Sequence, residues 1–198
     1  MSKKVIFATG NAGKIKEAKE ILGQLGLEVI SQKEAGLAAD VEENGGTFAA
    51  NALIKARAIA AQCNDIVIAD DSGLEVDYLN GEPGVYSARW MGEDTSYDIK
   101  NNKIIELLKE AKEEERTARF VCAIGCVLPD GSEIEGYGVM EGMIGHSQSG
   151  SNGFGYDPIF FLPEYGKTSA DLSMEEKNKI SHRGKALRNL CEKLKQRV

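Results

Sequence analysis

Asp70 and Asp71 are adjacent carboxylates between an apolar run, residues 67–69, and the dipeptide Ser72-Gly73. The run is short and rich in β-branched residues, which predicts a buried strand. Burying two charged neighbours inside a strand is costly, so we expect the pair to follow its C-terminal end, where open α/β sheets usually bind ligands. Adjacent like charges need a cation, and oxygen-rich sites suit Mg²⁺. An ordinary turn at a strand end is the alternative.

The segment before the first helix could bind phosphate. An apolar strand at residues 5–8 leads into Thr9, Gly10, Asn11, Ala12, Gly13 and Lys14. Ile15, Ala18, Leu22 and Leu25 then recur at helical spacing. Free backbone N–H groups and the helix dipole favour an anion at such a helix start. Lys14 opposes the dipole, which also points to a bound anion. The loop is not a Walker A motif, and a generic tight turn is the alternative.

Composition limits the kind of protein. The chain has 198 residues, 42% hydrophobic and 28% charged, as in an ordinary globular protein of one domain or two closely packed lobes. A net charge of −7 argues against a non-specific nucleic-acid binder. The N-terminus lacks the apolar stretch of a signal peptide, and no apolar run approaches the length needed to span a membrane. We therefore expect a cytoplasmic protein with neither nucleic-acid nor membrane partners.

Cysteine spacing predicts reduced thiols. Cys63, Cys122, Cys126 and Cys191 form no metal-binding pattern. Cys122 and Cys126 fall in an expected strand, about 13 Å apart at 3.3 Å per residue, which is too far for a disulfide or a shared zinc ion.

The elements alternate between α and β. A second strand is expected at residues 27–30, and helices at 47–63 and from Ser96 into a solvated charged end at 113–116. Residues 117–128 and 133–143 read as a long hairpin. Ser173 and Glu176 form a capping box before a helical C-terminal region. Such a hairpin in an α/β chain predicts a central mixed β-sheet flanked by helices, across one domain of residues 1–198.

Two later segments carry further chemistry. Residues 151–158 place Phe154 and Tyr156 around Gly155, followed by Asp157 and a proline. Aromatic rings on a glycine-rich loop can stack on a base, or they can plug the loop onto the core. Lys177, His182 and Arg183 are candidate hydrogen-bond donors. A lysine-rich helix surface and a capped helix end would explain these residues equally well.

The ordered set of motifs resembles the inosine/xanthosine triphosphate pyrophosphatases, which hydrolyse non-standard purine nucleoside triphosphates. The likeness covers nearly the whole chain. It includes residues 8–14, 42–45, 47–48, 51–52, 55–56, 69–73, 83–89, 154–158 and 181–183. Related enzymes that act on modified pyrimidine nucleotides carry a Ser-Pro-Arg-Arg type segment in place of residues 11–14.

The resemblance implies a role for each matching position. Asp71 matches the general base and a Mg²⁺ ligand, with Glu42 as the other ligand. Asp70, Glu43 and Lys55 match supporting positions. The resemblance implies that the triphosphate is bound by Thr9, Gly10, Asn11, Ala12, Gly13 and Lys14, and that Ser72 contacts the substrate. Recognition of the purine and sugar is implied for Phe154, Gly155, Tyr156, Asp157, Lys177, His182 and Arg183. The resemblance further implies Mg²⁺ as cofactor, two lobes with the active site in the cleft between them, and a homodimer.

Two positions depart from the family pattern. Ala50 stands where a glutamate is usual, which weakens any role of that side chain in placing metal or water. Asn152 stands where glycine is common, on a loop that should tolerate it.

The expected reaction converts ITP, dITP or XTP to the monophosphate and pyrophosphate, which would keep such nucleotides out of DNA and RNA. Lys14, Lys55 and Mg²⁺ can neutralise phosphate charge, while Asp71 can position water. A nucleotide-binding regulator would gain little from carboxylates beside phosphates, and a metal-dependent nuclease is disfavoured by the net acidity.

Overall fold

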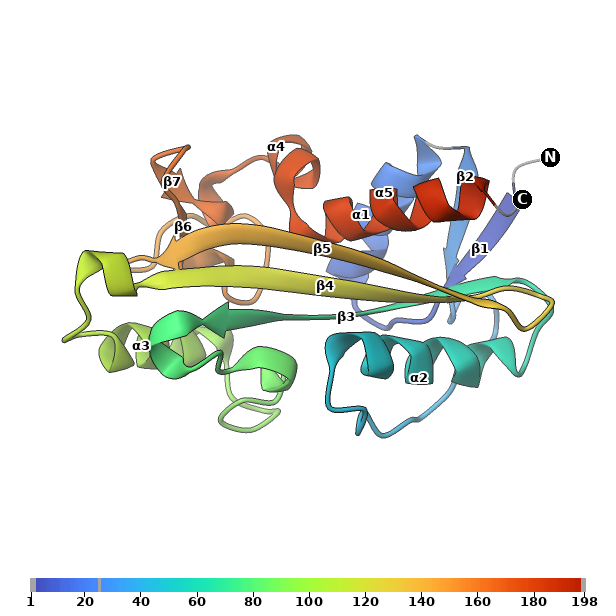
Figure 1. Cartoon of the computed structure of the whole chain (residues 1–198), viewed down its shortest axis with the longest axis horizontal. Helices are drawn as coiled ribbons and strands as arrows, with labels where there is room; N and C mark the ends of the chain where they lie inside the picture. The colour runs from blue at the N-terminus through green and yellow to red at the C-terminus, as the bar shows by residue number, and fades with distance from the viewer. Residues whose placement is uncertain (1–2, 25, 197–198) are drawn as a thin grey trace. The chain divides into compact units, whose positions relative to one another are not determined.

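The computed structural model describes residues 3–24 and 26–196. Its strands are β1 Lys3–Phe7, β2 Leu27–Ser31, β3 Ile66–Val76, β4 Thr117–Val127, β5 Glu133–Ile144, β6 Phe160–Leu162 and β7 Lys167–Thr168. Its α-helices are α1 Ala12–Gly23, α2 Phe48–Ala60, α3 Tyr97–Leu107, α4 Met174–Ile180 and α5 His182–Lys195 (Figure 1). Short 3₁₀ turns include η3 Glu113–Glu115, η4 Asp157–Ile159 and η5 Ser169–Asp171. The alternating α/β class is confirmed, while Leu25 lies outside the described residues.

The strands form one mixed sheet in the order β2-β1-β3-β4-β5-β6-β7. β1 pairs in parallel with β2 and with β3. β5, β6 and β7 pair antiparallel in succession. β4 and β5 are neighbours joined by the tight turn at residues 129–132, so the expected hairpin and the mixed sheet are both confirmed.

The chain divides into two compact units. The first holds the described residues of 1–72, 122–138 and 181–198, and the second holds 73–121 and 139–180. Each unit has its own apolar core. A single domain with a cleft between two lobes stays a prediction.

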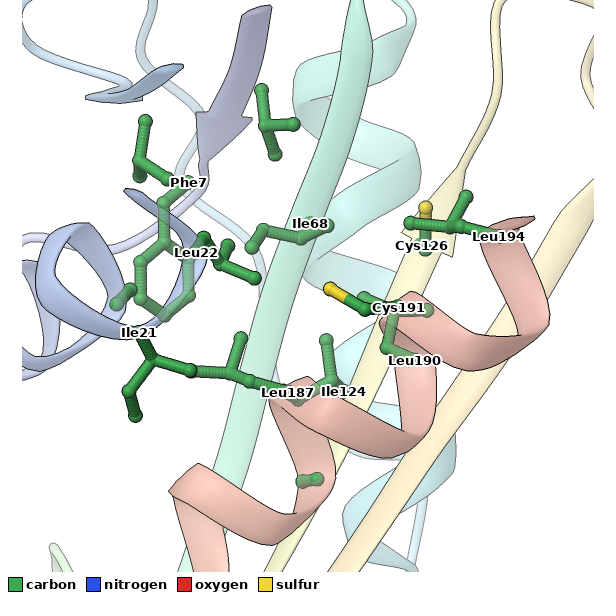
Figure 2. Close-up of a cluster of buried hydrophobic side chains, with 14 of the residues drawn as sticks. Phe7, Ile21, Leu22, Ile68, Ile124, Cys126, Leu187, Leu190, Cys191 and Leu194 are labelled. Atoms are coloured by element: carbon green, nitrogen blue, oxygen red, sulfur yellow. The ribbon is translucent and has the colours of Figure 1, made fainter. Parts of the chain in front are cut away.

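The first unit packs helices on its strands. Ile21 and Leu22 of α1, Ile68 of β3, and Leu187 and Leu190 of α5 share one buried cluster (Figure 2). Figure 1 shows α2 on the opposite face of these strands from α5. A Cβ at Gly138 would lie 2.2 Å from the His182 carbonyl oxygen, so β5 needs a glycine there for α5 to approach.

The second unit gathers its own core from β3, α3, β4 and the 156–162 segment. Phe120 and Phe160 stack with their ring centroids 4.3 Å apart. Tyr156 is buried in the same cluster, and its hydroxyl donates to the Ser87 carbonyl at 2.7 Å. Tyr156 therefore packs the loop onto the core, which was one of the two readings of this aromatic.

Asp70 and Asp71 lie inside β3, so the expectation that they follow the strand's end is wrong. β1 pairs with β3 only as far as Ile68, which places both carboxylates just past the C-terminal end of β1. The strand continues because cationic side chains neutralise the buried charge, as described below. Both carboxylates therefore still lie at the edge of the sheet where the parallel strands end, which is where open α/β sheets usually bind ligands.

Arg116 is not part of a solvated helix end. α3 ends at Leu107, and residues 113–115 form the separate turn η3. Arg116 is 1% exposed and donates to the carbonyls of Ile144, Leu108 and Gly145 at 2.7–2.8 Å. The charged run at residues 113–116, which was predicted to be solvated, therefore contains one buried arginine. Its guanidinium can be buried because three backbone carbonyls accept its hydrogen bonds.

Local signals at helix starts are confirmed. Thr47 caps α2, Ser96 caps α3 and Ser181 caps α5 through their side-chain oxygens. The Ser173 and Glu176 side chains each accept the other's backbone N–H before α4, as a capping box requires. Within the described residues, no helix combines the length and apolarity that crossing a membrane demands.

Candidate functional site

In the loop after β1, side chains of the loop itself accept hydrogen bonds from its backbone N–H groups. Asn11 caps α1, and its side-chain oxygen accepts the N–H groups of Gly13 at 2.9 Å and Lys14 at 3.1 Å. Thr9 Oγ accepts the Asn11 N–H at 3.2 Å. Residues 10–13 are exposed, so solvent reaches this helix N-terminus, although Asn11 already binds two of the backbone N–H groups that were expected to be free. The positive end of the dipole makes it suitable for phosphate.

Asp70 is held by two cations. The carboxylate is 2% exposed, with Lys14 Nζ at 3.1 Å and Arg183 Nε at 3.0 Å. Burial raises the pKa of Asp70, but the positive charges of Lys14, Arg183 and Lys55 outweigh it and hold the pKa well below its usual range. Asp70 is therefore a permanent anion at neutral pH. Its bond to Lys14 also explains the lysine in the first turn of α1 without a ligand.

Asp71 has a different environment. It is 7% exposed, accepts the Asn51 side-chain amide at 3.0 Å, and lies 3.7 Å from Lys55 Nζ. Burial raises the pKa of this carboxyl above its usual range, and the negative charge of Glu43 adds to the rise, although Lys55 and Asn51 oppose it. A carboxylate with a raised pKa takes up a proton more readily, as a general base must.

Lys55 on α2 joins Asp71 to the acidic loop. Its Nζ lies 3.2 Å from Glu43, in addition to its contact with Asp71. Glu42 is exposed, and its carbonyl accepts the Asn44 N–H at 3.1 Å. Glu43, rather than Glu42, therefore forms the ion pair with Lys55, the lysine that also lies beside Asp71.

A cavity of about 270 Å³ opens in this unit. Thr9, Gly10, Lys14, Glu43 and Lys55 line it, together with Gln32. Residues of the loop after β1, two lysines and two acidic residues, Asp40 and Glu43, therefore line a single cavity within the first unit.

The described residues contain no cluster of three or more His, Cys, Asp or Glu side chains arranged to hold a metal ion. Two carboxylates, Glu43 and Asp71, nevertheless converge on the Lys55 ammonium. Mg²⁺ commonly uses one or two carboxylates and completes its shell with water and substrate phosphates. The oxygen donors present fit that pattern.

Two buried polar residues bind Asp71 and Arg183, although neither was assigned a role from the sequence. Asn51, which is fully buried, accepts the Gly45 N–H at 2.8 Å and donates to Asp71, so it ties the acidic loop to β3. Glu17 is 5% exposed and accepts from Arg183 and from Ser181 Oγ. Each of these polar side chains interrupts the apolar face of its helix, and this interruption is the feature of the sequence that could have indicated a buried polar contact.

Arg183 and His182 begin α5. The Arg183 guanidinium is 1% exposed and binds Asp70, Glu17 and, at 3.1 Å, Ser72 Oγ. His182 is 6% exposed. The structure therefore places both residues in the first unit, with Arg183 among the acidic groups.

The remaining predicted contacts lie in the second unit. Lys177 is 8% exposed and pairs with Asp157 at 2.6 Å, so it is no surface lysine. Its Nζ lies 5.2 Å from the centre of the Phe154 ring, which is 40% exposed. Of the two aromatic residues, Phe154 is the exposed one, because Tyr156 is in the core. The Gly155 carbonyl oxygen accepts the Asn101 side-chain amide at 3.1 Å.

Residues 5–193 match the Ham1 family. The dITP/XTP pyrophosphatase of Clostridium perfringens is 50% identical over 199 residues, which cover 98% of each chain. The protein of that name from Exiguobacterium sibiricum is 49% identical over 187 residues, or 94% of each chain. The structure of the Staphylococcus aureus Ham1 protein superposes with a TM-score of 0.87 at 43% identity and covers 99% of this chain and 100% of that one. The structure of a HAM1 protein from Coxiella burnetii superposes with a TM-score of 0.87 at 40% identity and covers 98% of this chain and 99% of that one.

These relatives confirm the likeness to inosine/xanthosine triphosphate pyrophosphatases that the motifs indicated. The match extends over almost the entire described chain in both sequence and fold. The chain belongs to the Ham1 family.

Proposed function

We propose that this protein hydrolyses dITP, ITP and XTP to the nucleoside monophosphate and pyrophosphate. One arrangement carries the proposal: Asp71, with its raised pKa, lies 3.7 Å from Lys55 in a unit whose cavity is lined by the phosphate loop. Relatives named dITP/XTP pyrophosphatase, half identical over nearly their full length, support the substrate class.

The first unit supplies groups suited to the triphosphate. The open N-terminus of α1 and Lys14 favour bound phosphate, and Lys55 adds a second positive charge. Asp71 takes the proton from the attacking water, because it is the carboxylate of the pair whose pKa lies above its usual range. Pyrophosphate leaves with its charge balanced by the lysines.

Mg²⁺ is the proposed cofactor. Asp71 and Glu42 would hold it, as the family likeness implies, with Glu43 beside them on Lys55. When bound, the ion would neutralise phosphate charge and polarise the bond that breaks. The crowding of carboxylates around one lysine is the structural observation that favours a divalent cation here.

Base choice is proposed to rest on hydrogen-bond donors. Inosine and xanthosine carry a carbonyl acceptor at position 6, where adenosine carries an amine donor. Lys177 offers N–H groups and no acceptor. Facing adenine, such a donor would lack a partner, at a cost of roughly 1–3 kcal/mol. We therefore expect ATP to be a poor substrate and GTP an intermediate or poor one. A cytoplasmic homodimer that removes these nucleotides from the pool completes the proposal.

Product analysis tests the function. The purified protein is incubated with ITP, XTP, dITP, GTP and ATP, with and without Mg²⁺, and the products are separated by ion-exchange chromatography. IMP plus pyrophosphate from ITP is the expected result, with loss of activity on chelation and recovery when Mg²⁺ is added back. Release of orthophosphate without added pyrophosphatase would contradict the proposed bond cleavage. Binding without turnover would indicate a nucleotide-binding regulator.

A further inference from the structure

The Asp157 carboxylate is the centre of a buried hydrogen-bond group in the second unit. Its Oδ2 accepts Lys177 Nζ at 2.6 Å and the Phe154 N–H at 2.8 Å. Its Oδ1 accepts the Ser169 hydroxyl at 2.8 Å. Asp157 is 2% exposed and Ser169 is fully buried. One carboxylate thus holds both the lysine and the backbone of the exposed phenylalanine.

The Gly153 backbone packs closely against the Oδ2 side of the Asp157 carboxylate. Gly153 has φ +75°, and a Cβ there would lie 2.2 Å from Asp157 Oδ2 and 3.2 Å from Lys177 Nζ. Any side chain at residue 153 would therefore displace the carboxylate from its two donors. The close approach of this backbone shows that the position of Oδ2 is tightly set.

Ser169 lies in a turn that several hydrogen bonds hold in place. It begins η5, where the Thr168 N–H and hydroxyl both donate to Asp171. Asn152 fastens the opposite loop to the same turn, because its N–H donates to the Ala170 carbonyl at 2.9 Å. Its side-chain amide donates to the Leu172 carbonyl at 3.0 Å. Asn152, where the family commonly has glycine, thereby gains a tethering contact.

We propose that Ser169 is a positioning residue for base recognition, acting through Asp157 on Lys177 and Phe154; this inference rests on the proposed function. The terminal torsion of an aspartate is soft, so the carboxylate can turn when nothing binds its second oxygen. The Ser169 hydroxyl fixes that torsion and reserves Oδ2 for Lys177 and Phe154. Small displacements of such groups are enough to change selectivity.

A merely structural role for Ser169 makes a different prediction. Loss of a buried hydrogen bond would then lower stability and slow every substrate in proportion. A positioning role changes the ratio between substrates, because only the groups that face the base move. The ratio of kcat/KM for ITP to kcat/KM for ATP is the quantity that separates the two.

Ser169→Ala is the test variant, and Ser149→Ala is a control in which an exposed serine–aspartate hydrogen bond is lost. Ser149 also donates its hydroxyl to an aspartate, Asp171, at 3.0 Å, but Asp171 is not a predicted substrate contact. Kinetics with ITP and ATP are measured for both variants, together with Tm. Binding of IMP and AMP, measured by titration calorimetry, gives a readout that does not depend on turnover.

Ser169→Ala is expected to lower the ITP-over-ATP ratio by about tenfold, the effect of weakening one hydrogen bond to a charged group. The loss should appear mainly in KM for ITP and in the affinity for IMP, while Ser149→Ala keeps the wild-type ratio. An unchanged ratio, or an equal fall for both nucleotides, overturns the inference. If Ser169→Ala fails to fold, Ser169→Cys, with a weaker donor of similar shape, must show a smaller fall in the same direction. Wild-type protein inactive on every nucleotide would instead overturn the proposed function.

Discussion

Asp70 and Asp71 are consecutive residues of β3 whose carboxyl pKa values move in opposite directions. Burial raises both, but two close cations, Lys14 and Arg183, reverse the effect for Asp70. Asp71 has a single lysine, at 3.7 Å, which it shares with Glu43. The two neighbouring carboxylates thus differ electrostatically: Asp70 is a fixed negative charge, whereas Asp71 is the residue proposed to accept the proton.

Asp71→Asn should reduce activity without reducing stability. If Asp71 handles the proton or the metal, the rate should fall on the order of 10²–10⁴-fold. Because the folded-state pKa is raised, the ionised carboxylate costs stability as the pH rises through that pKa, and the amide removes this cost. Steady-state kinetics and Tm at pH 7 check both effects. A variant that keeps more than about a tenth of the wild-type rate would remove Asp71 from the central role.

Asp70→Asn, in contrast, should lower the stability of the protein at neutral pH. Its lowered pKa means that its contribution is complete above the unfolded-state value of about 4 and is lost as the pH falls toward the folded-state pKa. Removing one partner of a buried ion pair should cost on the order of 3 kcal/mol at pH 7. Tm measured from pH 3 to 8 should fall less steeply on the acid side for the variant than for the wild type. Parallel curves would show that Asp70 does not titrate as described.

Arg183→Ala distinguishes two roles. The family likeness implies that Arg183 reads the purine, whereas its guanidinium is bonded to Asp70, Glu17 and Ser72. We expect the variant to lose ITP and ATP turnover in equal proportion and to have a lower Tm, because buried carboxylates lose their cation.

Glu17→Gln should act in the same direction with a smaller effect, since Asp70 still faces the guanidinium. The measurement is kcat/KM for ITP, XTP and ATP in both variants. A selective loss of ITP hydrolysis would restore the base-reading role of Arg183.

The cysteines should differ sharply in reactivity. Burial raises the pKa of Cys126 to about 12 and also raises the pKa of Cys122 and Cys191. Thiolate, the reactive form, is therefore scarce at these three residues. Cys63 is only half-buried. A disulfide reagent at pH 8 should modify about one thiol quickly and the others only after unfolding, and Cys63→Ser should remove the fast phase. Two fast thiols in the native protein would contradict this picture.

Much of the fold could be predicted because its signals are local. The β4–β5 hairpin follows from two strand patterns around one turn, and the capping box at Ser173 is contained in four residues. The first helix was also expected, but it begins at Ala12, inside the segment read as the preceding loop, where Asn11 caps it. The candidate site residues were found by type and motif, and their roles stay predictions.

The sequence by itself determined the α/β class, the helix starts and the identity of the chemically capable residues, because each depends on neighbours a few positions apart. Only the tertiary structure decided how their charges are balanced. Asp70 stays inside a strand because Arg183, 113 positions later, supplies its cation. Arg116 is buried because carbonyls near residues 108 and 144 reach it. Electrostatic energy depends on distance in space, and buried charge is stable only where distant segments bring a partner within a few ångströms.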